Sequence, residues 1–232
     1  MSTGIGSLIS PTNNSSKESL SSWLFVGIDP KVVPMTSNAT TPIVRKLAER
    51  SDPSERNVSL QPTQHREVVL HVEAESLDNM RKRAEVRVEQ PSGSTFEIIC
   101  DEGPYLGGDD SAPPPLAYYS ASLAFCLLTQ LSRYASIKKL EISKMRLSQE
   151  TRFAMEGSVA KGSLSGRGVE VVTQLDIESE ESSEAIQRMI EVGEQSCFVH
   201  QSVIQTVPTR IEAKHNGSPL PMDRPREPGS TA

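Results

Sequence analysis

The chain has 232 residues, of which 36% are hydrophobic and 23% are charged, and its formal net charge is −6. This length suits either one sizeable domain with appendages or two small domains, and we favour one domain. The composition is that of an ordinary globular protein, and its acidic balance argues against electrostatic binding to nucleic acid.

The start of the chain and the length of its apolar stretches indicate the cellular compartment in which the protein is expected. Residues 1–20 are rich in serine and lack the apolar segment of a secretory signal. The longest apolar stretch is shorter than the ~20 residues that a membrane-spanning helix needs. We therefore expect a cytoplasmic protein with no membrane partner. In a reducing compartment, Cys100, Cys126 and Cys197 are either inert core thiols or redox-active ones.

Both ends of the chain differ in composition from the middle. Residues 1–20 and 216–232 are rich in Ser, Gly, Pro and Asn, which predicts two disordered tails. Residues 21–64 are expected to form an N-terminal arm, with a short helix in TTPIVRKLAER that has Pro42 near its first turn. The main domain is then residues 65–215.

The first half of this domain has a strand pattern followed by a helix pattern. Apolar and polar residues alternate over 68–74 and 80–88, which predicts an antiparallel hairpin with one solvated face. A third strand is expected in TFEIIC. After the loop DEGPYLGGDDSAPPP, residues 116–131 are apolar nearly all round, which predicts a helix inside the protein.

The second half repeats strands and helices in blocks. Strands are expected at 137–147, 151–159 and 169–177, and Ser179 is the expected N-cap of the next helix. A short helix in CFVHQSV and a last strand in TRIEAKH follow. Blocks of strands and helices without strict alternation predict an α+β domain with an antiparallel sheet.

Three features of the sequence together resemble one family. They are the loop LGGDDSAPPP, the helix LAYYSASLAFC that reaches Cys126, and the later QSCFVHQSV that holds Cys197. In this order they resemble the OsmC/Ohr family of osmotically inducible and organic hydroperoxide resistance proteins. The resemblance implies antiparallel sheets wrapped around a central buried helix, an intertwined homodimer with sites at the subunit interface, and thiol-dependent reduction of organic hydroperoxides.

The chemistry of two thiols agrees with that function. A thiolate attacks the O–O bond and becomes a sulfenic acid, and a second thiol condenses with it to form a disulfide, which a thiol reductant later resets. Cys126 and Cys197 are the candidate pair. An inert core thiol is the alternative for Cys126, because free cysteine is among the most buried residue types. Cys100 is expected to be packed only.

Ionisation of Cys126 needs a cation, because the residue lies beyond the first helical turn, where the helix dipole acts. The candidates are Arg81, Arg83 and Arg87 on the polar face of the second strand, and Arg83 is the one we favour; a solvated strand face is the alternative. Cys197 is expected at a helix N-terminus, which would lower its pKa, and His200 lies one helical turn further on.

The sequence also departs from the family pattern. Peroxidases of the family carry a glutamate just after the loop proline, where this chain has Leu116 and Ala117. Two alternatives to a peroxidase therefore stay open: a module that binds a hydrophobic small molecule, and a dimeric interaction protein whose arm grips a partner subunit. The acidic loop residues lack calcium-loop spacing, so we expect neither a metal nor a cofactor.

Overall fold

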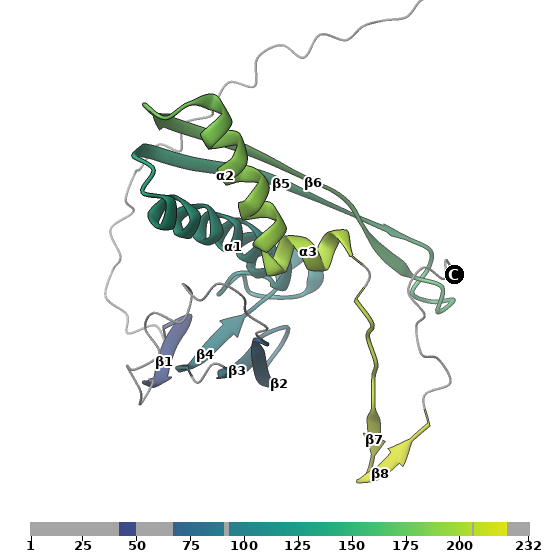
Figure 1. Cartoon of the computed structure of the whole chain (residues 1–232). Coiled ribbons are helices and arrows are strands. Elements are labelled where there is room, and N and C mark those ends of the chain that lie inside the picture. The colour runs from purple at the N-terminus through teal and green to yellow at the C-terminus, as the bar shows by residue number, and fades with distance from the viewer. Residues whose placement is uncertain (1–41, 50–66, 91–92, 206, 222–232) are drawn as a thin grey trace, which may run out of the picture. The chain divides into compact units, whose positions relative to one another are not determined.

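A computed structural model describes residues 42–49, 67–90, 93–205 and 207–221 (Figure 1). These residues belong to one compact unit that begins at Pro42. The predicted tail at 1–20 and most of the predicted arm lie outside the described residues. The predicted α+β class with antiparallel sheets is confirmed.

The elements are β1 (Val44–Ala48), β2 (Val69–Ser76), β3 (Lys82–Gln90), β4 (Thr95–Cys100), the 3-10 turn η2 (Pro104–Leu106), α1 (Pro115–Lys138), β5 (Ile142–Glu156), β6 (Ser165–Ser179), α2 (Ser183–Ser196), α3 (Phe198–Ile204), β7 (Ala213–His215) and β8 (Ser218–Leu220).

The first sheet contains four antiparallel strands in the order β1-β4-β3-β2. The predicted hairpin of β2 and β3 and the predicted third strand are confirmed. Glu85 of β3 lies opposite Glu97 of β4, and Val86 lies opposite Phe96. Because side chains alternate along a strand, one face of this sheet is charged and the other is apolar.

The prediction of a helix in TTPIVRKLAER is wrong, because Val44–Ala48 forms strand β1. The carbonyl of Ile43 accepts a hydrogen bond from Ile99 N–H at 2.9 Å, and Val44 lies opposite Ile98. Pairing with the free edge of β4 satisfies backbone groups that a short isolated helix would leave to solvent, and such helices are marginal in water. The folded unit therefore extends upstream of the predicted boundary at residue 65.

Helix α1 supplies the core through one stripe. It begins at Pro115, where the missing N–H costs no helical hydrogen bond. Its buried residues recur every fourth position, while Phe125 on another face is 68% exposed. The predicted burial all round the helix is therefore not found in the single chain. The buried residues of α1 are Leu123, Leu127, Leu131 and Ala135.

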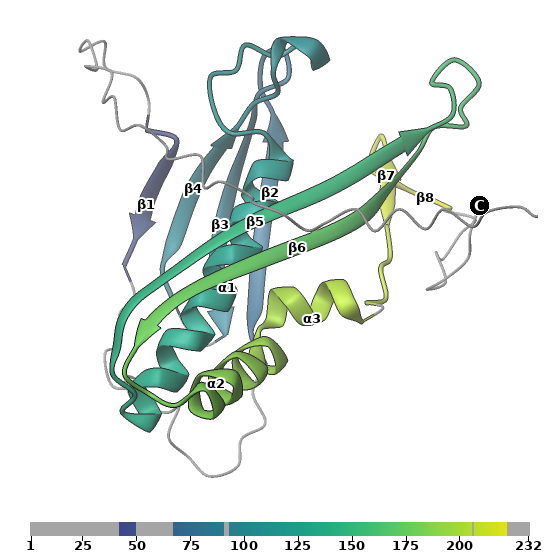
Figure 2. The same ribbon diagram turned by 90° about the horizontal axis from the view of Figure 1, so that it is seen from above.

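Strands β5 and β6 form a long antiparallel ribbon beside α1 (Figure 2). The sequence predicted two strands at 137–147 and 151–159, but residues 142–156 form a single strand. The polar stretch Ser148–Glu150 does not interrupt the strand, although its composition predicts a loop. It is paired without interruption, with Ser148 opposite Gln174 and Glu150 opposite Val172, so polar side chains there do not end the ladder.

Helix α2 starts three residues later than predicted. The Ser182 hydroxyl, not Ser179, accepts a hydrogen bond from Ala185 N–H at 3.2 Å and caps the helix. Ser179 instead donates its hydroxyl hydrogen to the Glu141 carbonyl at 2.8 Å, which joins the end of β6 to the start of β5. The short helix predicted in CFVHQSV is confirmed as α3. Helix α2 packs against α1, and α3 contacts both helices.

The prediction of a disordered tail over 216–232 is wrong for residues 216–221, which the structure describes. Residues 218–220 form β8, which pairs with β7. Asn216 and Gly217 connect the two strands with φ values of 52° and 80°. An Asn-Gly pair with both φ angles positive is the favoured two-residue hairpin turn, and this signal was present in the sequence.

None of the helices in the described part of the chain is long and apolar enough to cross a membrane.

Candidate redox site

Two cysteines far apart in the sequence meet between α1 and α3. Cys126 lies on α1 and is half-buried, and Cys197 is the fully buried N-cap residue of α3. The Cys126 side chain packs against the buried cluster that contains Cys197, and its proximity is one of the causes that raise the pKa of the Cys197 thiol. Both are free thiols, and both pack in the apolar cluster that includes Leu127 and Met189. The structure therefore brings together the two thiols that the sequence singled out.

Cys197 is held as a neutral thiol. Burial raises its pKa to about 11, the neighbouring Cys126 side chain acts in the same direction, and the backbone N–H groups of His200 and Val199 act against both. The sequence correctly predicted that a helix begins at Cys197. The predicted lowering of its pKa is wrong, because removal of the sulfur from water outweighs the local N–H groups.

His200 lies against the same sulfur. Its Nδ1 atom is 3.2 Å from Cys197 Sγ. Burial lowers the pKa of His200, and the Glu194 carboxylate opposes this effect. A histidine with a lowered pKa is a neutral imidazole at pH 7, which can accept a proton.

His200 also lines an apolar cavity of about 680 Å³ between α1, α2, α3 and the β5–β6 ribbon. The rings of Tyr119 and Phe153 meet edge to face in its wall, with their centroids 5.8 Å apart. Neither thiol is among the described residues that line the cavity, but His200, whose Nδ1 lies 3.2 Å from Cys197 Sγ, does line it. Most of the other lining residues are aliphatic, and they include Leu123, Leu127, Leu175, Ile190, Val203 and Ile204.

The start of α1 contributes only part of its apolar side chains to the cavity. Tyr119 lines the cavity, but Leu116 is 53% exposed and does not line it. The Tyr118 hydroxyl donates a hydrogen bond to the Ile99 carbonyl at 2.6 Å and so ties α1 to β4. Cys100 is half-buried next to Tyr118, whose pKa is raised mainly by burial and also by this thiol.

The three arginines proposed as activating cations all lie on or beside β3. Arg83 forms ion pairs with Glu75 at 2.5 Å and Glu97 at 4.0 Å, and Arg87 pairs with glutamates of its own strand. Arg81 Nη1 lies 3.6 Å from an aspartate, and its buried Nε has no hydrogen-bond partner among the described residues. Arg83 as the activating cation stays a prediction.

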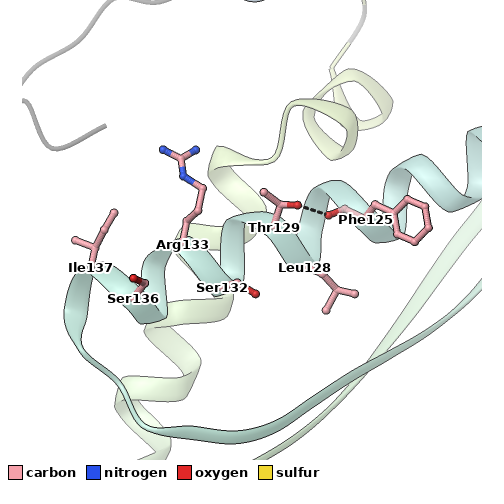
Figure 3. A pocket seen from close by; sticks show the side chains of 7 residues that line it. All are labelled: Phe125, Leu128, Thr129, Ser132, Arg133, Ser136 and Ile137. Atoms are coloured by element: carbon pink, nitrogen blue, oxygen red, sulfur yellow. Dashed lines mark hydrogen bonds between the residues drawn. The ribbon is translucent and has the colours of Figure 1, made fainter. Parts of the chain in front are cut away.

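A second hollow lies on the exposed face of α1 (Figure 3). Phe125 and Ile137 mark its two ends, and Arg133 projects from the helix between them. The Arg133 guanidinium lies 3.4 Å from Gln130 Oε1. Neither thiol lines this hollow in the described part of the chain, so it is separate from the cysteine pair.

The Gly-rich loop before α1 is organised by a buried acid, Asp101, whose structural role the sequence analysis did not identify. Asp101 accepts hydrogen bonds from the backbone N–H groups of Glu102, Asp109 and Ser111 at 2.8, 3.2 and 3.1 Å, and from the Ser111 hydroxyl at 2.7 Å. The Ser111 hydroxyl and these backbone groups lower the pKa of Asp101 despite burial. The missed signal is an aspartate that directly follows a strand and opens a Gly/Pro loop.

No group of three or more His, Cys, Asp or Glu side chains suited to a metal ion occurs within the described ranges.

Comparisons with known proteins support the resemblance. Residues 108–212 match the family model described as OsmC-like protein, so the resemblance is confirmed for this stretch. Similar solved structures include an OsmC-like hydroperoxide resistance protein from Jannaschia sp. CCS1, which is 24% identical with a TM-score of 0.44, the match covering 66% of this chain and 97% of that one. The organic hydroperoxide resistance protein OhrB of Bacillus subtilis is 14% identical with a TM-score of 0.35, over 60% of this chain and 92% of that one. No curated protein matches the chain.

Proposed function

We propose that this chain, whose residues 108–212 match the OsmC-like family, is a thiol-dependent peroxidase that reduces organic hydroperoxides with Cys126 and Cys197. The observation that supports the proposal is that both thiols, one from α1 and one from the start of α3, pack in the same buried cluster, where Cys126 is one of the causes that raise the pKa of Cys197. Two inert core thiols need not meet, whereas a disulfide-forming pair must.

The proposed reaction has two steps that balance. The Cys126 thiolate attacks the outer oxygen of the hydroperoxide, the O–O bond breaks, and the alkoxide leaves with a proton as an alcohol, so that Cys126 becomes a sulfenic acid. Cys197 then attacks the oxidised sulfur, a disulfide forms, and the hydroxyl group leaves as water. A thiol reductant, which we propose as the partner of the oxidised protein, restores both thiols by exchange.

The surroundings of the pair favour an organic substrate. The cavity of about 680 Å³ beside His200 is lined mainly by aliphatic and aromatic side chains. An apolar cavity of this size takes up the hydrocarbon part of a substrate, and hydrogen peroxide has none. We therefore propose organic hydroperoxides as the substrate class.

The cation that ionises Cys126 is the remaining requirement. We retain Arg83 for this role and propose that it acts on Cys126 of a second copy in a homodimer. What supports this is that the Arg83 side chain is 52% exposed and that two large apolar side chains, Phe125 and Ile137, are exposed on the outer face of α1 in the single chain. Large exposed apolar faces are typical of association surfaces. Phe125→Asp is expected to convert a dimer into a monomer, as measured by light scattering.

Thiol counting tests the proposed function. One equivalent of cumene hydroperoxide is expected to remove two thiols from the Cys100→Ser protein, and the added substitution Cys126→Ser is expected to abolish this loss, because it removes the nucleophile. The Cys100→Ser protein serves as the matched control, because it lacks the third thiol but keeps the pair. If all thiols survive the hydroperoxide, the peroxidase proposal fails.

A binding module for an apolar small molecule is the second candidate, and the same cavity favours it. A large side chain inside the cavity, as in Val203→Trp, is expected to abolish uptake of a fluorescent apolar probe. Probe binding together with thiols that do not react with hydroperoxide would support this candidate over the peroxidase.

The interaction-protein alternative concerned residues 21–64. The described part of that segment, strand β1, pairs with β4 of its own chain. A truncation that tests the alternative should therefore remove residues 1–41 and keep β1. If the mass in solution is unchanged, those residues do not hold a partner.

A further inference from the structure

We propose that His200 is the base that takes the thiol proton of Cys197 when Cys197 attacks the oxidised sulfur of Cys126. The proposal rests on the thiol-pair chemistry proposed above and assigns a catalytic role to a third side chain. It follows from the position of His200 Nδ1, which lies 3.2 Å from Cys197 Sγ. His200 follows Cys197 by one helical turn of α3, so the two side chains lie on the same side of the helix.

Cys197 needs a base because of where it lies. Its side chain is fully buried, so water does not reach the sulfur to remove the proton. Burial also raises the pKa of the thiol to about 11, which leaves almost no thiolate at neutral pH. Only the thiolate is an effective nucleophile toward a sulfenic acid or a disulfide.

His200 is suited to accept that proton. Burial lowers the pKa of His200, so the imidazole is neutral at pH 7 and one ring nitrogen has a free lone pair. We assign the hydrogen to Nε2, because Nδ1 then accepts from the Cys197 S–H group. A neutral, preplaced imidazole within hydrogen-bonding distance is the arrangement that general-base catalysis requires.

The cavity offers the proton a way out. His200 lines the cavity, and the Glu194 carboxylate, which raises the pKa of His200, lies in the same wall. The other ionisable groups around the cavity are Tyr119 of α1, Arg152 of β5 and Glu170 of β6, and the latter two pair with each other at 3.6 Å. Glu194 is therefore the carboxylate that stabilises a protonated His200.

The step balances as follows. The Cys197 S–H proton moves to His200 Nδ1 while the sulfur forms a bond to Cys126 Sγ. The hydroxyl group on Cys126 leaves with the bonding pair and takes a proton from solvent, so the products are a disulfide and water. His200 then returns its proton to solvent. The hydroperoxide that oxidised Cys126 is the only oxidant the sequence of steps requires.

The test uses thiol exchange instead of a hydroperoxide, so it does not depend on peroxidase activity. In the full-length Cys100→Ser protein, one equivalent of dithiobis(nitrobenzoate) is expected to react at Cys126 and release one thionitrobenzoate. Attack by Cys197 then releases the second one and closes the disulfide. Stopped-flow absorbance separates the two phases, and Cys197→Ser identifies the second, because it abolishes that phase alone.

His200→Asn is expected to slow the second phase about 100-fold and to leave the first unchanged, because a general base contributes on the order of 10² or more. The pH profile should also change. The wild-type rate should level off above the pKa of His200, whereas the variant rate should keep rising about tenfold per pH unit toward the pKa of Cys197. Free imidazole should restore part of the rate in His200→Ala. His71→Asn is the matched control, since His71 lies exposed on β2 beside Glu73 at 3.2 Å.

Three results would overturn the proposal. In the first, His200→Asn keeps the wild-type second phase and pH profile. In the second, it slows both phases equally and imidazole restores neither, which indicates a structural role. In the third, the wild-type protein shows no second phase, so the thiols do not form the pair. A second phase in a protein whose thiols resist hydroperoxide would contradict the peroxidase and leave His200 as a base for disulfide exchange.

Discussion

The acidic side chains of Asp101 and Cys197 are both fully buried, but their pKa values are shifted in opposite directions. The pKa of Asp101 is lowered by the Ser111 hydroxyl and by several backbone N–H groups, so its carboxylate stays charged. The pKa of Cys197 is raised to about 11 by burial, so its thiol stays neutral. The difference shows that burial alone does not decide the direction of a pKa shift. The direction also depends on the hydrogen-bond donors that face the group.

The two positions differ in the backbone that surrounds them. Asp101 directly follows β4, where the loop from Gly103 to Ser111 folds back so that N–H groups of the loop point at the carboxylate. Cys197 lies between two helices that pack apolar side chains such as Met189 against it. The loop directs three backbone N–H groups and a hydroxyl at Asp101, whereas the N–H groups of Val199 and His200 at the start of α3 do not offset the burial of Cys197. The Asp101 carboxylate therefore stabilises the loop through its hydrogen bonds, whereas Cys197 remains a free thiol that can react.

The largest effect is expected at Asp101. In Asp101→Ala, four donors lose their acceptor and three of them are backbone N–H groups that shape the loop before α1. Each donor left unpaired inside the protein is unfavourable, so we expect the thermal unfolding midpoint to fall by roughly 10 °C. Differential scanning calorimetry measures this directly.

The matched control for Asp101 is Asp109→Ala. Asp109 is an exposed carboxylate of the same loop that accepts a hydrogen bond from Asn79 at 2.9 Å. Its loss should change the midpoint by about 2 °C or less. Equal shifts in the two variants would show that the loop is not organised by Asp101.

The second effect is expected at Gly108, where the loop comes closest to itself. A Cβ atom on Gly108 would lie 1.8 Å from the Glu102 carbonyl oxygen, which is backbone and has little freedom to move. Gly108→Ala should therefore displace the N–H groups that reach Asp101 and destabilise the fold by ~1–3 kcal/mol.

Gly103→Ala provides the comparison for Gly108, because nothing lies within 4 Å of its would-be Cβ and its φ of −70° suits any residue. It should be neutral in urea unfolding. If Gly108→Ala is equally neutral, the close approach in the loop does not constrain it.

The sequence predicted most elements where local signals agreed. The alternation over β2 and β3 and the proline-initiated helix α1 both appear, because period and turn chemistry pointed the same way. The strand β1 was predicted as a helix, because its five residues carry no clear period and their pairing with β4 is a long-range interaction. The long ribbon was divided at Ser148–Glu150, since polar residues in a strand resemble a loop when only the sequence is known.

The candidate site was predictable in its residues but not in its electrostatics. The order of loop, helix and second cysteine pointed to Cys126 and Cys197, which the structure brings together. The direction of the pKa shift at Cys197 depended on how deeply the sulfur is buried, and that is set by residues such as Leu131 and Met189 from other elements. No local pattern contains that information.

The smallest effect is expected in alkaline solution and concerns Cys197. The pKa of Cys197 is raised from its ordinary value of 9.0 to about 11 in the folded chain, so folding favours the neutral thiol. This contribution to stability is fully present below pH 9 and is lost as the pH rises toward 11, because the unfolded chain then releases the proton more readily. The slope from one such group cannot exceed about 1.4 kcal/mol per pH unit. Cys197→Ala and Cys197→Ser should both remove this part of the alkaline decline in urea unfolding, even though their packing differs. If stability declines equally in the variants and in the wild type, the pKa of Cys197 is not raised by folding. The contrast with Asp101 then does not hold.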